Sequence, residues 1–148
     1  MKLALASTSL MALAVGISCN TKIEQENVPL SSETQVLEKR SWLKNINARE
    51  AFLMLGSKQP PVVLDIRTPF EHKGGRIKGS MLNNFYSQDF ELKLSEMDRA
   101  QPVIVHCASG GRSSQSLKLF KALEFENVFH LDGGIKAWNA EGYPLVKD

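Results

Sequence analysis

The chain has 148 residues, and single globular domains mostly run to about 100–200 residues. Its 43% hydrophobic and 23% charged content is close to the average for soluble globular proteins, which excludes collagen-like, low-complexity and wholly disordered chains. The net charge is only +2 and no block of like charge stands out, so the composition does not indicate a nucleic-acid-binding surface. Two cysteines are too few for a disulfide-stapled mini-protein.

The first 18 residues have the layout of an export signal. One positive charge, Lys2, is followed by an uncharged apolar run that ends at Ser18, as in secretory signals. The run is short for a membrane span, which takes about 20 apolar residues. We therefore expect residues 1–18 to be a signal peptide and the protein to be exported to the periplasmic side or the cell envelope.

Cys19 follows this run directly, with the small residues Gly16 and Ser18 before it. The pattern resembles a bacterial lipoprotein signal, in which the peptide is cut before a cysteine that carries the lipid. Gly16 stands where the lipoprotein pattern prefers Leu, and an ordinary cleaved signal with an incidental cysteine is the alternative. The resemblance implies lipidation of Cys19 and attachment of the protein to a membrane through this anchor.

Residues 19–41 are predicted to be a tether. They are rich in Glu, Gln, Asn, Ser and Thr, and their isolated apolar residues keep no helical or strand period. A flexible coil of this length has an r.m.s. span of about 26 Å, which holds a domain clear of a bilayer. A short helix over Val36–Arg40 that packs on the domain is the alternative for its end. The folded domain is expected over residues 42–148.

From Trp42 onward, patterns typical of strands and helices alternate. Asn47, with Glu50 three residues later, predicts a helix that begins with a capping box. Alternation of this kind indicates an α/β fold with a mostly parallel central sheet flanked by helices on both faces. The predicted elements, in chain order, are a helix over Ala48–Gly56, strands over Val62–Ile66 and Val103–His106, a helix over Ser113–Leu123, a strand over Val128–Leu131 and a helix over Ile135–Ala140.

A loop of small residues follows the strand Val103–His106 and leads into a helix. Because its side chains lack bulk, its backbone can curl and direct successive N–H groups inward as an anion-binding nest. A cysteine at the rim of such a nest lies near amides, a helix N-terminus and Arg112, all of which favour the thiolate. Cys107 is therefore the candidate nucleophile, and a buried inert cysteine beside a Gly-rich turn is the alternative. The candidate substrate-binding residues are Ala108, Ser109, Gly110, Gly111, Arg112 and Ser113.

Two enzyme families share this strand–loop–helix architecture, and the length of the loop separates them. Tyrosine phosphatases have five residues between the cysteine and the arginine, whereas four lie between Cys107 and Arg112. The shorter loop resembles that of the rhodanese (sulfurtransferase) family, Cys-x-x-Gly-x-Arg-Ser/Thr. Cys107, Gly110, Arg112 and Ser113 occupy the positions of this pattern.

Three other segments resemble rhodanese motifs in the expected order, so that the resemblance extends over about residues 42–147. They are Asp65–Glu71, Gly75–Ser80 and Leu131–Trp138. Arg76 replaces a usual His, and His72 stands where an aromatic residue is common.

The resemblance implies a single-domain sulfurtransferase similar to thiosulfate sulfurtransferase. Cys107 would take a sulfane sulfur from a small anionic donor and hold it as a persulfide, while the loop amides and the Arg112 guanidinium bind the anionic part of the donor. Cyanide, a thiol or a protein thiol would accept the sulfur. No metal or organic cofactor is implied, and the protein is expected to be a monomer. A phosphatase or arsenate-reductase-like enzyme and a non-catalytic rhodanese-fold binding module remain as alternatives.

Other polar residues near these motifs are expected to have structural roles. Asp65 is expected to end a strand and anchor a turn, and Arg67 to hold the neighbouring loops, with a catalytic Asp65–Arg67 pair as the alternative. His106 precedes Cys107 within a strand, where adjacent side chains point to opposite faces, so it is a poor candidate for a general base. The sequence places nothing near the other two histidines, His72 and His130.

Overall fold

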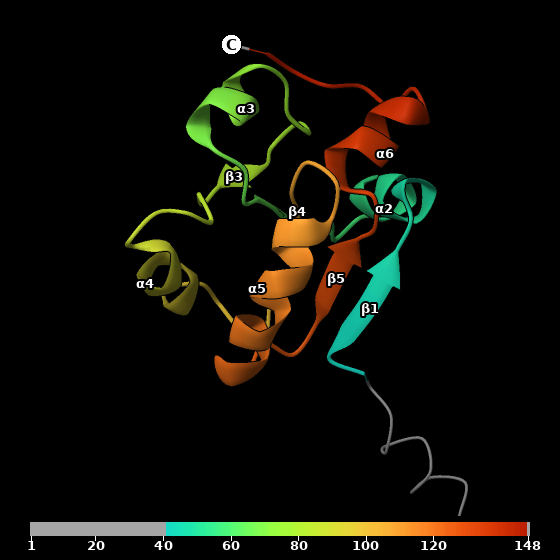
Figure 1. Ribbon diagram of the computed structural model, residues 1–148. Helices are drawn as coiled ribbons and strands as arrows, with labels where there is room; N and C mark the ends of the chain where they lie inside the picture. The colour runs from blue at the N-terminus through green and yellow to red at the C-terminus, as the bar shows by residue number, and fades with distance from the viewer. Residues whose placement is uncertain (1–40, 148) are drawn as a thin grey trace, which may run out of the picture. The chain divides into compact units, whose positions relative to one another are not determined.

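The computed structural model describes residues 41–147 (Figure 1). The predicted signal peptide, Cys19 and nearly all of the predicted tether lie outside this range. No helix in the described part is long and apolar enough to cross a bilayer. The elements are β1 (Leu43–Ile46), α2 (Ala48–Leu55), β2 (Val62–Asp65), α3 (Pro69–Lys73), β3 (Met81–Leu82), α4 (Phe90–Ser95), β4 (Val103–His106), α5 (Gly111–Ala122), β5 (Val128–Leu131) and α6 (Gly134–Ala140).

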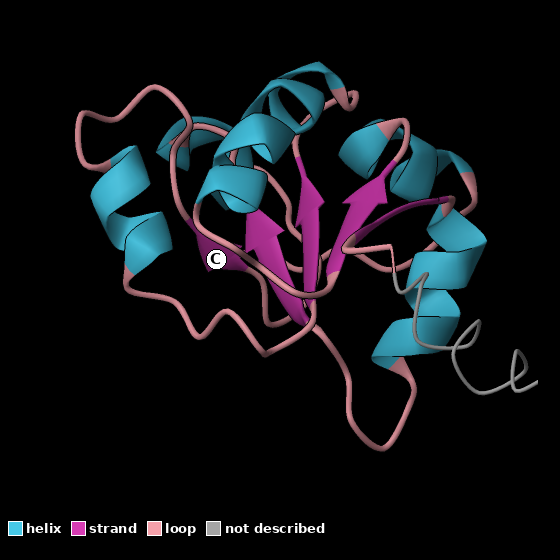
Figure 2. Ribbon diagram, turned by 90° about the horizontal axis from the view of Figure 1, so that it is seen from below, coloured by secondary structure: helices cyan, strands magenta, loops and turns pink. Residues whose placement is uncertain are grey.

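The five strands form one sheet in the order β1-β5-β4-β2-β3, and every strand pair in it is parallel. Figure 2 shows these strands surrounded by helices. The predicted α/β fold with a parallel sheet is confirmed. Because β4 is the central strand, the residue that follows it, Cys107, lies at the carboxyl edge in the middle of the sheet, where parallel sheets place their ligand sites.

Two apolar layers cover the two faces of the sheet, as the alternation of side chains along β4 shows. Val103 and Val105 belong to one layer together with Cys107, whereas Ile104 belongs to the other. A strand covered on both faces needs apolar residues at every position, which is why β4 was predictable from its sequence. The helices contribute Phe90, Leu94 and Phe120 from α4 and α5 to the first layer, and Ala48, Ala51 and Trp138 from α2 and α6 to the second.

Two helices begin with a capping box, in which the side chain before the helix and a glutamate three residues later each bond the other's backbone N–H. The box at Asn47 and Glu50 starts α2 as predicted, and an equivalent box at Thr68 and Glu71 starts α3. The elements β1, α3, β3 and α4 were not predicted. All four are short, and β1 has two exposed residues in its middle, so none has a clear apolar period.

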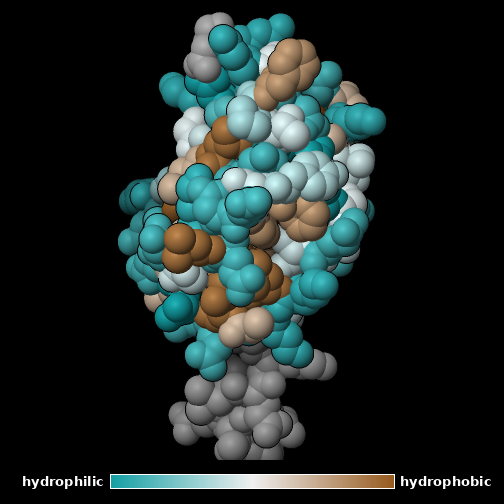
Figure 3. All heavy atoms as spheres, turned by 60° about the vertical axis from the view of Figure 1, so that its left-hand side comes forward, coloured by the Kyte–Doolittle hydropathy of each residue, from teal (hydrophilic) through white to brown (hydrophobic). Residues whose placement is uncertain are grey.

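Most of the large apolar side chains that the described residues expose lie over α3, β3 and α4, on the face shown in Figure 3. Phe70 is 90% exposed, although it is a phenylalanine in the first turn of α3. It precedes Glu71, which contacts the Cys107 loop as described below. The other exposed side chains of this face are Met81, Leu82, Tyr86 and Leu92.

Candidate active site

The thiol of Cys107 lies inside a turn of backbone between β4 and α5. The side chain is only 1% exposed. The N–H of Gly110 donates to its Sγ over 3.2 Å, and the Ser113 Oγ lies 3.7 Å from the same atom. Gly110 has a φ of +95°, a left-handed conformation that glycine adopts without a steric penalty. The loop therefore brings hydrogen-bond donors to Sγ, as a nest would.

These donors determine the protonation of the thiol. Burial raises the pKa of Cys107, but the N–H and hydroxyl of Ser113 and the N–H groups of Ser109 and Gly110 lower it by more, so that the pKa falls below its usual value. Hydrogen bonds to the charged form of a group favour that form. The loop therefore makes Cys107 a better source of thiolate than a free cysteine.

The first turn of α6 holds the opposite side of this loop. The N–H of Ile135 donates to the Cys107 carbonyl over 2.9 Å, and the N–H of Lys136 donates to the Ala108 carbonyl over 3.0 Å. The Ala108 carbonyl and the Ser109 N–H belong to one peptide and point in opposite directions. Because the carbonyl points toward α6, the Ser109 N–H points away from α6 and toward the thiol. A Cβ on Gly134 would lie 2.5 Å from the Cys107 carbonyl oxygen, so this close approach requires glycine.

The Arg112 guanidinium has a protein partner that the sequence did not predict. It donates to both carboxylate oxygens of Glu71, over 2.9 and 2.6 Å, and it lies 5.7 Å from the centre of the Tyr86 ring. The hydrogen bond with Arg112, assisted by those with Thr68 and opposed by burial, lowers the pKa of Glu71 from 4.5 to about 2. Glu71 in turn raises the pKa of Arg112. The charge of the loop arginine is therefore balanced by α3.

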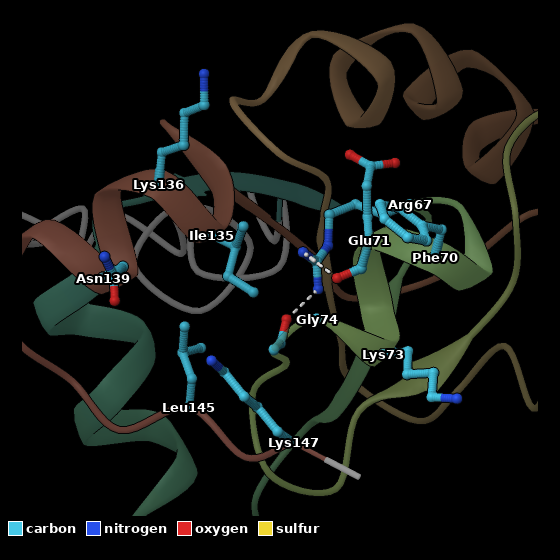
Figure 4. A pocket seen from close by; sticks show the side chains of 11 residues that line it. Arg67, Phe70, Glu71, Lys73, Gly74, Ile135, Lys136, Asn139, Leu145 and Lys147 are labelled. Carbon is cyan, nitrogen blue, oxygen red and sulfur yellow. Dashed lines mark hydrogen bonds between the residues drawn. The ribbon is translucent and has the colours of Figure 1, made fainter.

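A buried ion pair holds α3 in place. Arg67 donates to both carboxylate oxygens of Asp65, through Nε to Oδ1 and through Nη2 to Oδ2, the shorter contact being 2.6 Å, and both side chains are buried. The same guanidinium donates to the carbonyl oxygens of Glu71 and Gly75, over 3.1 and 2.8 Å (Figure 4). The structural roles predicted for Asp65 and Arg67 are confirmed, and Arg67 also fixes the backbone of Glu71, the partner of Arg112.

His106 is fully buried, with its Nδ1 3.2 Å from the Cys107 carbonyl oxygen and its Nε2 3.8 Å from Asp65 Oδ2. Burial lowers its pKa, although Asp65 partly opposes this. Neither ring nitrogen is hydrogen-bonded to Sγ. This agrees with the prediction that His106 is a poor general base.

The prediction that nothing lies near His130 is wrong. Its buried ring has Nε2 3.0 Å from Ser113 Oγ and 3.2 Å from the Gly110 carbonyl oxygen, and Nδ1 3.1 Å from Asn45 Oδ1. His130 therefore supports the serine that contacts the thiol. Parallel pairing of β1 with β5 places Asn45 opposite His130, and a single sequence contains no signal of that register. His72 lies away from this group, 3.3 Å from Ser80 Oγ.

Comparison of the sequence with known protein families identifies the family of this domain. A family model described as "Rhodanese-like domain" matches residues 47–141, which is more than half of the chain. The chain belongs to the rhodanese-like domain family. Two of the other three sequence motifs contact the Cys107 loop of this rhodanese-like domain, through Glu71 of α3 and through the first turn of α6. The third, the turn at Gly75, accepts a hydrogen bond from Arg67.

Relatives of this rhodanese-like domain include a "Sulfurtransferase" from Allochromatium vinosum, 28% identical over 70% of this chain and 95% of that protein. A "Thiosulfate sulfurtransferase GlpE" from Pseudoalteromonas translucida is 34% identical over 66% of this chain and 90% of that protein. Other relatives are longer, and the chain spans between 30% and 55% of their length. A crystal structure of a rhodanese-related protein from Thermoplasma volcanium is 30% identical, with a TM-score of 0.63, over 71% of this chain and 99% of that one.

Proposed function

We propose that the protein is a sulfurtransferase that takes a sulfane sulfur from an anionic donor such as thiosulfate and passes it from a Cys107 persulfide to a thiol or to cyanide. The observation that supports this best is the position of the Cys107 Sγ, buried within a loop whose Gly110 N–H donates to it over 3.2 Å. Relatives that the chain matches along nearly their whole length are named sulfurtransferases.

In the first half-reaction, the Cys107 thiolate attacks the outer sulfur of thiosulfate. The S–S bond of the donor breaks, sulfite leaves, and the outer sulfur remains on Cys107 as a persulfide. Negative charge moves from Sγ to the outer sulfur without a change in total charge. The amides and hydroxyl that lower the pKa of Cys107 stabilise this charge in the same way as an oxyanion hole does.

In the second half-reaction, the thiolate of the acceptor attacks the outer sulfur of the persulfide. A new S–S bond forms on the acceptor, the bond to Cys107 breaks, and the Cys107 thiolate is regenerated. The transfer requires no external oxidant or reductant.

Arg112 is proposed to bind the anionic part of the donor while its guanidinium remains paired with Glu71. A guanidinium has five N–H donors, and one N–H on each of Nη1 and Nη2 donates to Glu71. The remaining donors are available to the sulfonate oxygens of thiosulfate. Loss of one such charge-assisted contact costs about 1.5–3 kcal/mol.

We also propose that the protein is exported through a signal peptide at residues 1–18 and anchored through a lipid on Cys19. The basis is the apolar run before Cys19 and the polar segment after it. The rhodanese-like domain would then work at a membrane surface on the periplasmic side or in the cell envelope.

The decisive experiment is the intact mass of the protein after treatment with thiosulfate and removal of the excess. The expected result is the addition of one sulfur atom, which cyanide then removes as thiocyanate. Cys107→Ser should take up no sulfur, whereas Cys19→Ser, the matched control at the other cysteine, should take up one. Hydrolysis of an aryl phosphate with no persulfide would overturn the proposal in favour of a phosphatase, and absence of both reactions would favour a binding module.

A further inference from the structure

The hydroxyl of Ser113 has one proton and three possible acceptors for it. Its Oγ lies 3.0 Å from the Gly110 carbonyl oxygen, 3.0 Å from His130 Nε2 and 3.7 Å from Cys107 Sγ. A serine hydroxyl donates only one hydrogen bond at a time. Ser113 therefore stabilises the thiolate only when the other two groups do not take its proton.

The ring of His130 settles this competition at its own nitrogen. The Nε2 atom lies 3.2 Å from the Gly110 carbonyl oxygen. A carbonyl oxygen can only accept hydrogen bonds, so this contact requires a proton on Nε2. A ring nitrogen that carries a proton does not accept another one from Ser113. The Nε2–H therefore donates toward the Gly110 carbonyl and the Ser113 oxygen.

The carbonyl of Gly110 is then fully occupied. Its oxygen has two lone pairs. One accepts from the N–H of Ser114 over 2.8 Å, and the other accepts from the Nε2–H of His130. Of the three acceptors around the Ser113 hydroxyl, the sulfur of Cys107 is the one that remains for its proton.

The other ring nitrogen is held by Asn45. Its Oδ1 lies 3.1 Å from Nδ1 of His130, and the ring is only 6% exposed. An amide side chain offers its oxygen or, after a half-turn, its NH₂ group. Asn45 thus fits the doubly protonated ring and also the neutral ring with its proton on Nε2. The nitrogen that faces Gly110 is a donor in both forms.

We propose that His130 is a positioning residue for the nucleophile, which uses its Nε2–H to direct the hydroxyl proton of Ser113 to the Cys107 thiolate. The proposal rests on the proposed sulfurtransferase function only in taking Cys107 as the nucleophile. Without the ring, a lone pair of the Gly110 carbonyl is free to take the Ser113 proton, and the thiolate loses a donor. The lowered pKa of Cys107, to which the Ser113 hydroxyl contributes, agrees with this role.

Other titratable groups surround the loop and are left unaltered in the test. Arg112 is paired with Glu71. The Asp132 carboxylate lies on the same side of the loop as His130 and accepts from the next N–H of the chain. His106 is buried, with Nδ1 against a loop carbonyl. A change in the reactivity of the thiol then reports the hydrogen bonds of the replaced side chain.

The test measures the rate of alkylation of Cys107 by iodoacetamide as a function of pH. His130→Leu removes the donor and keeps a side chain of similar size, so the profile should move to higher pH by about 0.4–1 pH unit, the effect of one ordinary hydrogen bond. His130→Gln keeps an N–H donor that can reach the Gly110 carbonyl, so its profile should stay close to that of the unaltered protein. His72→Leu, the same change at the histidine that contacts Ser80, is the matched control and should cause no shift.

A second comparison shows whether His130 acts through Ser113. Ser113→Ala removes the proton that the ring directs, so adding His130→Leu to it should shift the profile no further. Nitrogen-15 NMR of the unaltered protein provides a measurement that needs no variant, because the chemical shift of the His130 Nε2 should be that of a protonated ring nitrogen.

Four results would overturn the proposal. They are an unshifted profile in His130→Leu, an equal shift in His130→Gln or His72→Leu, additive shifts in the double variant, and an Nε2 without a proton. The first two comparisons separate hydrogen bonding from packing of the ring. Persulfide formation by the unaltered protein tests the proposed function separately, since alkylation and NMR require no sulfur transfer.

Discussion

Glu71→Gln should weaken the rhodanese-like domain through one contact, the ion pair with Arg112. The pair stabilises the folded state because the pKa of Glu71 is about 2 there, compared with 4.5 in a free side chain. This difference, at about 1.4 kcal/mol per pKa unit, corresponds to about 3 kcal/mol. The Glu71 side chain keeps 31% of its exposure, so solvent screening reduces the expected loss to about 1–2 kcal/mol.

The sign of the pH dependence identifies the source of this loss. A carboxyl whose pKa is lowered by folding contributes its full stabilisation above its unfolded pKa, and loses it as the pH falls toward the folded value. The free energy of unfolding, measured by urea denaturation, should therefore differ most between wild type and Glu71→Gln at pH 7. The difference should shrink as the pH falls from 5 toward 2. At pH 7, the expected fall in Tm is about 5–10 °C.

Glu50→Gln is a matched control, because Glu50 occupies in the capping box of α2 the position that Glu71 occupies in α3. Glu50 pairs with an exposed lysine, so its loss should be the smaller of the two. A double-mutant cycle with Arg112→Gln should give most of the Glu71 effect as coupling energy. If the loss were independent of pH, or additive with that of Arg112→Gln, the ion pair would not be its cause.

Cys19→Ser should move the protein from a detergent-extracted membrane fraction to a soluble exported fraction, and identical fractionation of both proteins would contradict lipidation. Gly134→Ala should lower the free energy of unfolding by more than about 2 kcal/mol. A Cβ at this position would clash with the Cys107 carbonyl oxygen, and an alanine backbone is strained at a φ of +59°. Gly79→Ala, at a φ of +78° in open space, is the control for strain alone, and equal losses in a thermal melt would exclude the clash. Ser113→Ala should shift the alkylation of Cys107 by iodoacetamide to higher pH, because the hydroxyl is one of the groups that lower the pKa; an unshifted profile would show that the backbone amides alone set it.

The parts of the fold that the sequence predicted are those buried on both sides. Strands β2, β4 and β5 consist almost entirely of buried residues, and three of the four residues in each are apolar, so each is a mostly apolar run that the sequence alone reveals. The edge strand β1 has Lys44 and Asn45 exposed at its centre, and β3 has only two residues. Their place in the sheet depends on pairing with a neighbour, which a local pattern does not contain.

The candidate site likewise has a part that the sequence predicted and a part that it did not. Cys107 and its loop were predictable because all the residues are consecutive and their small size is itself a signal. The pairing of Glu71 with Arg112 spans 41 positions, and that of His130 with Asn45 spans 85. The last residue of the Asp65–Glu71 motif was the available signal for the first pairing. Only the strand register reveals the second.

The loop is held by residues near both ends of the domain, and this has a consequence for when its support is complete during synthesis of the chain. Ser113 is hydrogen-bonded to His130, and the His130 ring is hydrogen-bonded to Asn45 near the start of the domain. The loop carbonyls accept hydrogen bonds from Ile135 and Lys136 near the end of the domain. A chain that has emerged only as far as α5 contains the donors of the thiol but lacks His130, Ile135 and Lys136, which hold those donors in place. The loop is therefore expected to gain its full support only after α6 has been synthesised and has docked.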